Sequence, residues 1–363
     1  MEIFMEKIKV GILGTGRGID IALGIRYTKD AVISAVCDRN EVRLEKWKNE
    51  FPKRGVEGFA CFTEYEEMLK SDIDAVIIAS EPHNHAEQAI MALEAGKHVL
   101  SEIPTIYTVE DARRLKAAVK AHPELKYMVG ENACYWEYIK TWKKMREDGR
   151  FGTIIYAEAE YLHCSTPIDQ IKPPKDPNYW RRHLPAIRYL THSLGPLLYV
   201  MDDEVTKVSC YVPEFEYNKY NKEKSVGVAL FQTKKGAVIR IFICFGAYVE
   251  FDHNFALYGS NGMIMTDKTE KFYDKNCFAR FADIPTRVDE MIEIPVGVDI
   301  CRNRNANDHG GADPKMVADF IKCIVEDTKP ELDVDAGIKM SLPGIIAEQS
   351  YKNGNASLEI PEI

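Results

Sequence analysis

The sequence of 363 residues lacks the features that mark membrane, secreted or nucleic-acid-binding proteins. No apolar run approaches the roughly 18 residues of a membrane span, and the N-terminus (MEIFMEKIKV) lacks the apolar core of a signal peptide. The net charge of −9 provides no general basic excess with which to neutralise phosphates. We therefore expect a cytoplasmic protein that binds neither a membrane nor nucleic acid.

The spacing of the cysteines argues against a disulfide-stabilised protein and against a metal-binding one. The nine cysteines are scattered, and they include no Cys-x-x-Cys pair. Several, such as Cys37 and Cys244, lie inside apolar runs, which is typical of small core residues. His163 and Cys164 are adjacent on an expected strand, so their side chains point to opposite faces. We expect reduced thiols, no disulfide framework and no metal site.

The first third alternates short apolar runs with amphipathic stretches. Strands are predicted at residues 9–14, 31–38, 74–80, 98–102 and 126–132, and helices at 18–28, 41–51, 83–95 and 108–121. The last helix has a start signal, because Thr108 is followed three residues later by Asp111. This alternation predicts a parallel sheet wrapped by helices, in which the carboxyl ends of the strands share one edge.

A glycine-rich turn follows the first strand at that edge. It comprises Gly14, Thr15, Gly16, Arg17 and Gly18. Such a turn lets backbone N–H groups approach a pyrophosphate, although glycines also serve ordinary tight turns. Asp38, at the end of the second strand, can accept hydrogen bonds from ribose hydroxyls, and its charge favours NAD over NADP. Arg39 keeps NADP open as the alternative, because its guanidinium can bind a 2′-phosphate; it can also stack on adenine.

The run DAVIIASEPHNHAEQAIMALEAGKHVLSEIP, residues 74–104, resembles the signature region of the glucose–fructose oxidoreductase and inositol dehydrogenase family, Gfo/Idh/MocA. The resemblance implies an α/β fold, an NAD-binding Rossmann domain, at residues 1–130. It also implies an α+β domain with an open, mostly antiparallel sheet at 131–363, which binds substrate and joins subunits of a homo-oligomer. The further cofactor-binding candidates at the sheet edge are Ser80, His85, Glu102 and Asn132. For His85 a structural role near the helix start is the alternative.

The residue pattern of the second half of the chain independently predicts a domain of strands and helices. β-rich runs are predicted at 152–163, 207–215, 225–233 and 237–246, and helices at 186–202, 314–325 and 336–352. The stretch 168–182 is rich in proline and aromatics, and we expect an ordered loop over the site there. Within it, Trp180 and Arg181 can stack on and bind a sugar, or simply cover the core.

Two residues that many members of the family use are missing. Many members carry Glu-Lys-Pro where this chain has Glu102-Ile103-Pro104, and many carry an aspartate where Arg188 precedes His192 by four positions. The segment RYLTHSLGP is instead similar to that of the NAD-dependent N-acetylgalactosaminidases of the same superfamily. ENACYWEY (131–138) and HGGAD (309–313) are similar to further segments of that branch. His309, flanked by glycines, is therefore a substrate-binding candidate.

These residues suggest a replacement for the lysine. A histidine with a pKa near 6.5 suits the removal of a hydroxyl proton at neutral pH, and His192 is the candidate base. Tyr189, three residues earlier on the same helix face, and Tyr135, at the end of the sixth strand, are further catalytic candidates. The alternative is that His192 is a core histidine packed among leucines.

The leading hypothesis is an NAD-dependent oxidoreductase that removes hydride from a sugar or glycoside hydroxyl, at C3. An alternative is a glycosidase that oxidises C3, eliminates the C1 substituent, adds water and reduces the ketone again. The motif segments contain no obvious carboxylic acid for the leaving group, which favours net oxidation or reduction. A third hypothesis is a non-catalytic protein that senses NAD or a sugar, since the lysine is absent.

Overall fold

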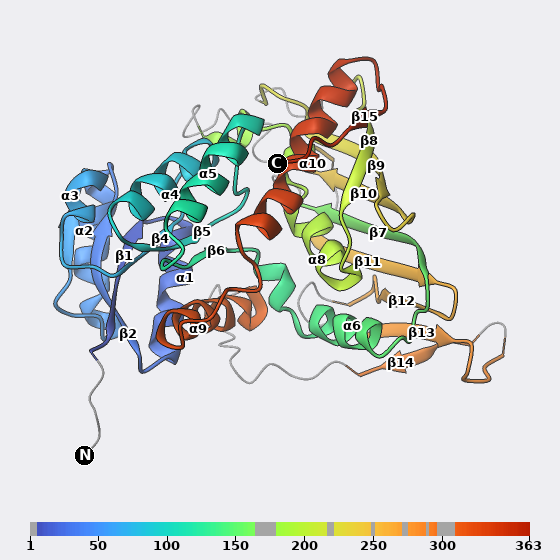
Figure 1. Ribbon diagram of the computed structural model, residues 1–363, viewed down its shortest axis with the longest axis horizontal. Helices are drawn as coiled ribbons and strands as arrows, with labels where there is room; N and C mark the ends of the chain where they lie inside the picture. Colours follow the sequence, from blue (N-terminus) through green and yellow to red (C-terminus); the bar gives the residue numbers. More distant parts are fainter. Residues whose placement is uncertain are drawn as a thin grey trace. The chain divides into compact units, whose positions relative to one another are not determined.

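The computed structural model describes residues 6–163, 179–215, 221–247, 251–270, 275–287, 290–295 and 309–363. Two compact units are formed, one by described residues of Met1–Asn132 and Ile300–Ile338, the other by those of Ala133–Asp299 and Lys339–Ile363. Each unit is labelled by element in Figure 1. The first boundary lies close to the predicted one at 130. The predicted assignment of everything after 130 to the second domain differs from the structure, because α9 (Ala312–Val325) packs against α1 (Arg17–Ala22).

The first unit contains a six-stranded sheet in the order β3-β2-β1-β4-β5-β6. Its strands are β1 (Ile8–Leu13), β2 (Ala31–Cys37), β3 (Ala60–Phe62), β4 (Ala75–Ile78), β5 (His98–Ser101) and β6 (Tyr127–Val129). All neighbouring strands are parallel, which confirms the predicted doubly wound architecture. The order reverses beside β1, and in such sheets ligands bind beyond the carboxyl ends at that switch point.

Helices cover this sheet much as the pattern predicts. They are α1, η1 (Leu23–Tyr27), α2 (Glu41–Glu50), η2 (Pro52–Arg54), α3 (Tyr65–Leu69), η3 (Pro82–Asn84), α4 (His85–Glu94), α5 (Val109–Ala121), η7 (His309–Gly311) and α9. The predicted start of α5 is confirmed, because Thr108 and Asp111 form a reciprocal capping box. α4 and α5 pack side by side, as Figure 1 shows.

The second unit contains a nine-stranded sheet in the order β14-β13-β12-β11-β7-β10-β9-β8-β15. Its strands are β7 (Ile154–Leu162), β8 (Val205–Tyr211), β9 (Val226–Thr233), β10 (Val238–Cys244), β11 (Asp252–Gly259), β12 (Gly262–Thr266), β13 (Cys277–Phe281), β14 (Ile292–Ile294) and β15 (Leu358–Glu359). Only β7 and β10 run parallel among the described pairs. The predicted open, mostly antiparallel sheet is confirmed.

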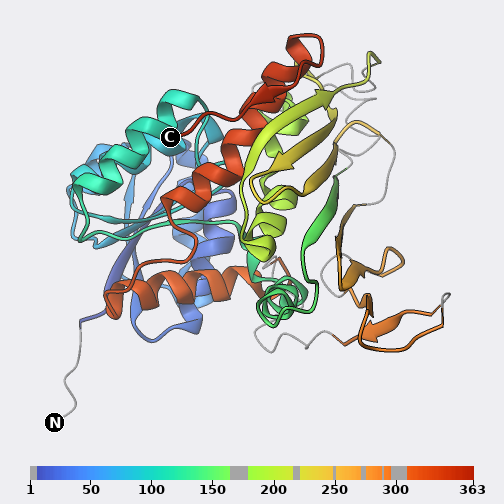
Figure 2. The ribbon, with the colours of Figure 1, turned by 45° about the vertical axis from the view of Figure 1, so that its right-hand side comes forward.

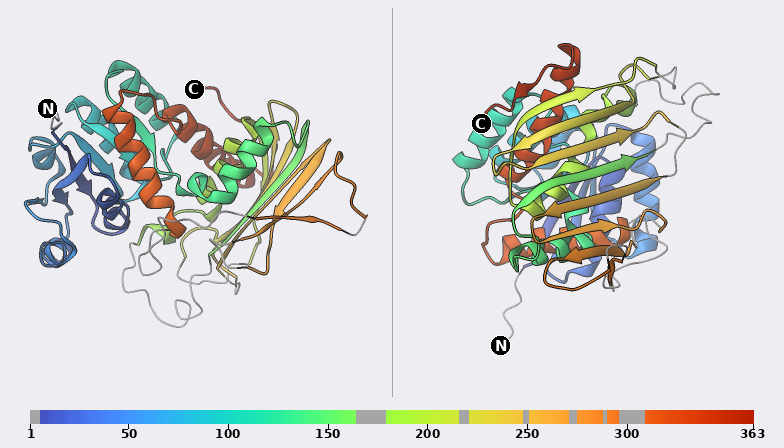
Figure 3. Two further views of the ribbon diagram at one scale, coloured as in Figure 1. Left: turned by 90° about the horizontal axis from the view of Figure 1, so that it is seen from below. Right: turned by 90° about the vertical axis from the view of Figure 1, so that its right-hand side faces the viewer.

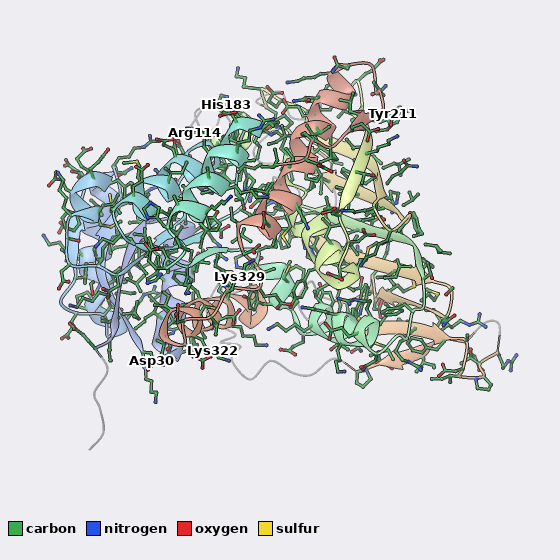
Figure 4. The ribbon with its side chains drawn as sticks, in the orientation of Figure 1. Asp30, Arg114, His183, Tyr211, Lys322 and Lys329 are labelled. Atoms are coloured by element: carbon green, nitrogen blue, oxygen red, sulfur yellow. The ribbon has the colours of Figure 1, made fainter. Side chains whose placement is uncertain are left out.

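Helices lie on one face of that sheet. α6 (Glu137–Glu147) and α8 (Thr191–Met201) pack together, and α8 packs on β7 (Figures 2 and 3). No described helix covers the opposite face, where Tyr211, labelled in Figure 4, is 55% exposed. The predicted helix 186–202 begins later than expected, because Ala186–Tyr189 forms a separate 3-10 turn, η6. α10 (Val334–Lys352) begins in the first unit and ends in the second.

The described cysteines carry no disulfide. Burial, and then the charge of Asp38, raise the pKa of the Cys37 thiol to about 12, so that it stays protonated at neutral pH. Cys164 and Cys301 lie outside the described residues. None of the described helices has the length and apolarity needed to cross a membrane.

A buried ion pair attaches α9 to the glycine turn. The Nη1 and Nη2 atoms of Arg17 each lie 2.5 Å from a carboxylate oxygen of Asp313, whose side chain has no exposed surface. Burial alone raises the pKa of a carboxyl group, but the charge of Arg17 and its hydrogen bonds hold the pKa of Asp313 well below its usual range. Asp313 is therefore ionised at neutral pH.

We predict that Asp313→Asn lowers the free energy of unfolding by about 3 kcal/mol at pH 7, because it leaves a charged guanidinium without its bidentate partner. The contribution of a carboxylate with a lowered folded pKa is complete above the unfolded pKa of about 3.9, so pH 7 measures all of it. Urea denaturation is the measurement. Asp72→Asn is the control: Asp72 is 86% exposed and pairs with Lys9, and its loss should cost less than about 1 kcal/mol. Equal effects of the two changes would contradict the prediction.

Candidate active site

The glycine turn has the geometry that a pyrophosphate site requires. Gly14 has a φ of 95°, and a Cβ there would lie 2.4 Å from the backbone oxygen of Ala79, so only glycine fits. A Cβ on Gly18 would lie 3.1 Å from Ile12, which explains how α1 approaches β1 so closely. A Cβ on Gly16 would meet nothing within 4 Å. The turn is thus closely packed at Gly14 and Gly18 and leaves space at Gly16, and its residues fit a dinucleotide.

Asp38 lies at the predicted place and braces this turn. One of its carboxylate oxygens accepts hydrogen bonds from the backbone N–H and the hydroxyl of Thr15, at 2.9 and 2.5 Å. The other accepts from the N–H of Asn40 at 2.9 Å. Each oxygen retains acceptor capacity, so a contact with ribose stays a prediction. Arg39 is exposed and pairs with Glu81 at 2.7 Å.

His85 connects two loops at the sheet edge. Its Nδ1 lies 3.0 Å from the carbonyl oxygen of Pro104 and its Nε2 lies 3.3 Å from that of Ser80. Burial lowers the pKa of His85, so the ring is neutral and can donate to one of these carbonyls. The Ser80 hydroxyl donates to Gln88 at 2.5 Å. These contacts are structural, and direct contact of either residue with the cofactor stays a prediction.

Asp313 contacts three of the predicted site residues, and a fourth is linked to it through Arg17. Besides Arg17, the Nδ2 of Asn132 lies 3.4 Å and the Nδ1 of His309 lies 3.1 Å from its carboxylate. The Nε of Arg17 donates to Glu102 at 3.0 Å. The guanidinium of Arg17 is therefore directed at two carboxylates. Arg17, Glu102, Asn132 and His309 thus form one network around Asp313.

The second unit brings together what we call the histidine cluster: Tyr161, His163, Tyr189, His192 and His253. Tyr161 lies at its centre, with ring centroids 5.7 Å from His163, 5.9 Å from Tyr189, 5.5 Å from His192 and 4.5 Å from His253. The rings of Tyr189 and His192 meet edge to face at 5.1 Å, so these predicted catalytic residues are neighbours even though Tyr189 precedes α8. His192 is only partly buried.

Strand register builds this cluster. Tyr161 on β7 is paired with His253 on β11. His253 is buried and contacts the hydroxyl of Ser193 through Nε2 at 3.3 Å. Burial, and then the neighbouring His192, hold the pKa of His253 well below its usual range. Burial, and then the charge of Arg181, lower the pKa of His163 to about 4. Both rings are neutral at pH 7.

The predicted sugar-gripping residues adjoin the cluster. They lie in η5 (Trp180–Arg182), at the end of the stretch 168–182, of which residues 168–178 are outside the described part. The rings of Trp180 and Tyr189 are 5.6 Å apart, and the guanidinium of Arg181 lies 4.7 Å from each ring. Trp180 and Arg181, two of the predicted substrate residues, thus contact the predicted catalytic residue Tyr189.

Two other predicted positions have contacts of their own. Tyr135 ends η4 (Asn132–Tyr135) and is buried, with the Lys140 ammonium 4.6 Å from its ring centre. Its catalytic role stays a prediction. Arg188 is buried and pairs with Glu348 at 3.4 Å, which gives the residue four positions before His192 a structural role. No group of three His, Cys, Asp or Glu residues in the described part is placed to hold a metal ion.

Sequence reasoning missed Asp313, Tyr161 and His253. Asp313 ends the HGGAD segment, but nothing in the sequence pairs it with Arg17, which lies near the opposite end of the chain. Tyr161 belongs to a predicted strand, whereas β11, which carries His253, was not predicted. Their pairing depends on a strand register that a single sequence does not reveal.

Three family profiles match the chain. Residues 8–131 match the oxidoreductase family with an NAD-binding Rossmann fold, and residues 139–265 match the GFO/IDH/MocA C-terminal domain. Residues 213–363 match the glycosyl hydrolase 109 C-terminal domain. Together these matches extend over both units.

Curated relatives and solved structures agree with the profiles. The chain is 27% identical to a glycosyl hydrolase family 109 protein of Solibacter usitatus, over 98% of this chain and 88% of that protein. It is 24% identical to an α-N-acetylgalactosaminidase of Shewanella oneidensis, over 99% of this chain and 85% of that enzyme.

Among solved structures, levoglucosan dehydrogenase in complex with NADH and levoglucosan has a TM-score of 0.83 at 20% identity, covering 98% of this chain and 100% of that one. Myo-inositol 2-dehydrogenase from Lactobacillus plantarum has a TM-score of 0.77 at 19% identity, with coverages of 98% and 100%. These likenesses confirm the fold. With its NAD-binding Rossmann domain and open-sheet second domain, the chain belongs to the Gfo/Idh/MocA family of oxidoreductases.

Proposed function

We propose that the protein oxidises a sugar or glycoside hydroxyl, at C3, by hydride transfer to NAD⁺, with His192 as the base. The observation that carries the proposal is the position of His192. It is partly exposed at the start of α8, while aromatic rings on neighbouring elements pack against it. An exposed imidazole edge held by packed rings is pre-organised to accept a proton.

His192 replaces the missing lysine in this proposal. Removal of hydride from a carbinol leaves its hydroxyl proton acidic, and a base must take that proton. His163 and His253 are neutral at pH 7, so neither places an imidazolium beside His192. Tyr189, in edge-to-face contact with His192, orients the ring and can bond a neighbouring hydroxyl.

Bound NAD⁺ supplies the hydride acceptor. Gly14–Gly18 would hold its pyrophosphate through backbone N–H groups. Asp38 would accept from the ribose, and its charge, with Arg39 already paired to Glu81, favours NAD over NADP. Ser80, His85, Glu102 and Asn132 would border the same cofactor. Hydride transfer requires one substrate carbinol to reach both the nicotinamide and His192.

A redox-neutral glycosidase is the second candidate, and the matches to glycosyl hydrolase family 109 favour it. Oxidation at C3 acidifies the C2 proton, and a base such as Tyr135 or Tyr189 then removes it as the C1 substituent leaves. Water adds to C1, and the hydride returns to C3. Both candidates share the first step. They differ in whether the reduced cofactor is released or used again.

Trp180, Arg181 and His309 would bind the sugar. We also expect a cytoplasmic homo-oligomer formed through the sheet of the second unit. The exposed side chains of Tyr211 and Leu230 on that sheet support this expectation.

His192→Ala should lower kcat/KM by about 10²- to 10⁴-fold, the usual contribution of a general base, while the affinity for NAD⁺ stays unchanged. Absorbance at 340 nm and a fluorescence titration with the cofactor measure the two effects. His183→Ala, at an exposed histidine of the same unit, is the matched control and should behave as wild type. Loss of NAD⁺ affinity, or full activity in His192→Ala, would contradict the assignment.

A nitrophenyl glycoside in deuterated water separates the two candidate reactions. Net oxidation predicts a 3-keto glycoside, with one NADH formed for each and no nitrophenol released. The glycosidase cycle predicts nitrophenol, deuterium at C2 of the recovered sugar and no net NADH. Mass spectrometry of the sugar together with absorbance at 340 nm decides between them, with His192→Ala as the blank. A 3-keto product would reject the glycosidase, and nitrophenol without NADH would reject the dehydrogenase.

A further inference from the structure

Arg181 carries a hydrogen-bond donor that no described residue accepts. Its Nη1 atom is fully buried and has no partner among the described residues. Its Nη2 atom reaches the Tyr189 hydroxyl only at 3.5 Å. A buried donor without an acceptor costs free energy, and the cost is larger for a charged group. A ligand that supplies the acceptor would remove this cost.

Aromatic rings hold this guanidinium in place. It lies 4.7 Å from the ring centres of Trp180 and Tyr189 and 5.4 Å from that of Phe245. These rings provide cation–π attraction, and the hydroxyl of Tyr189 among them is uncharged and lies 3.5 Å from Nη2. The side chain is therefore oriented without being neutralised.

No described carboxylate forms an ion pair with Arg181. Three other buried or half-buried arginines differ in this respect: Arg17 pairs with Asp313, Arg188 with Glu348 and Arg240 with Glu158. The adjacent Arg182 resembles Arg181, because it is buried and its Nε and Nη1 atoms have no partner among the described residues. The positive charge acts on its surroundings, because burial and then that charge lower the pKa of His163 to about 4. An anion beside Arg181 would therefore lie in a positive potential, next to the aromatic rings that pack around the guanidinium.

We propose that the substrate is an acidic sugar, whose carboxylate or sulfate group binds the Arg181 guanidinium. Arginine presents a planar fork of donors that matches such oxyanions. Tyr189 contacts both Arg181 and His192, so an anion on Arg181 lies one ring away from the proposed base. The inference rests on the proposed function, since it names the substrate class of that reaction.

Paired substrates test the inference. The full-length protein with NAD⁺ is assayed with 4-nitrophenyl glucoside, glucuronide and glucoside 6-sulfate, each as both anomers, by absorbance at 340 nm and by nitrophenol release. We expect kcat/KM to be about 10- to 100-fold higher for an anionic substrate, as for one charge-assisted hydrogen bond. Comparison of kcat/KM for the glucuronide and for the 6-sulfate shows whether Arg181 prefers a carboxylate or a sulfate. Isothermal titration with glucuronate, glucose 6-sulfate and glucose measures binding without turnover.

Arg181→Gln should abolish the preference for the anion, and Arg181→Lys should retain part of it, since the charge stays and the fork is lost. The ratio of anionic to neutral substrate within each variant is independent of the fraction that folds. Arg113→Gln, at an exposed arginine of α5, is the control and should keep the ratio of the wild type.

The outcomes separate the two proposals. Turnover of neutral glycosides with no preference for the anionic ones, or a preference that Arg181→Gln retains, would overturn the inference and leave the proposed function intact. Arg181-dependent binding of the anion without turnover would support the inference and contradict the proposed function. No turnover and no binding of any sugar would overturn both.

Discussion

The buried ion pair of Arg17 and Asp313 is the interaction on which the nucleotide-binding unit depends. It connects the glycine turn after β1 to a helix from the far end of the chain, and through Asp313 it also positions His309 and Asn132. A carboxylate without exposed surface is tolerable only because charge and hydrogen bonds surround it. The late segment is therefore part of the cofactor unit and not an appendage to the sheet that precedes it.

In the second unit, the candidate site residues are held in place by a different interaction. Its histidine cluster is held by ring packing on a fixed strand register. Tyr161 occupies the centre, and two of the three imidazoles are neutral at pH 7. Aromatic walls of this kind bind the apolar face of a sugar while leaving one imidazole edge for proton transfer. In the proposed mechanism, His192 replaces the missing lysine without adding a permanent charge.

The fold was largely predictable from local pattern, whereas the site was predictable only in part. Alternating apolar runs, the Thr108 capping box and the glycine turn are local signals, and the structure bears them out. The contacts of Asp313 with Arg17 and of Tyr161 with His253 are long-range, and a single sequence carries no signal for them. The helix at 186 was predicted too long because apolar periodicity does not distinguish a 3-10 turn from the first turn of an α-helix.

Transfer of hydride from a sugar carbon is the central claim, and an isotope measures it directly. A glycoside that the protein turns over is deuterated at C3 and mixed with NAD⁺-loaded protein, and the reaction is quenched within one turnover. The account predicts deuterium in the reduced cofactor, whether the net reaction is oxidation or glycoside cleavage. Turnover with the deuterium still at C3 and none in the cofactor would contradict it.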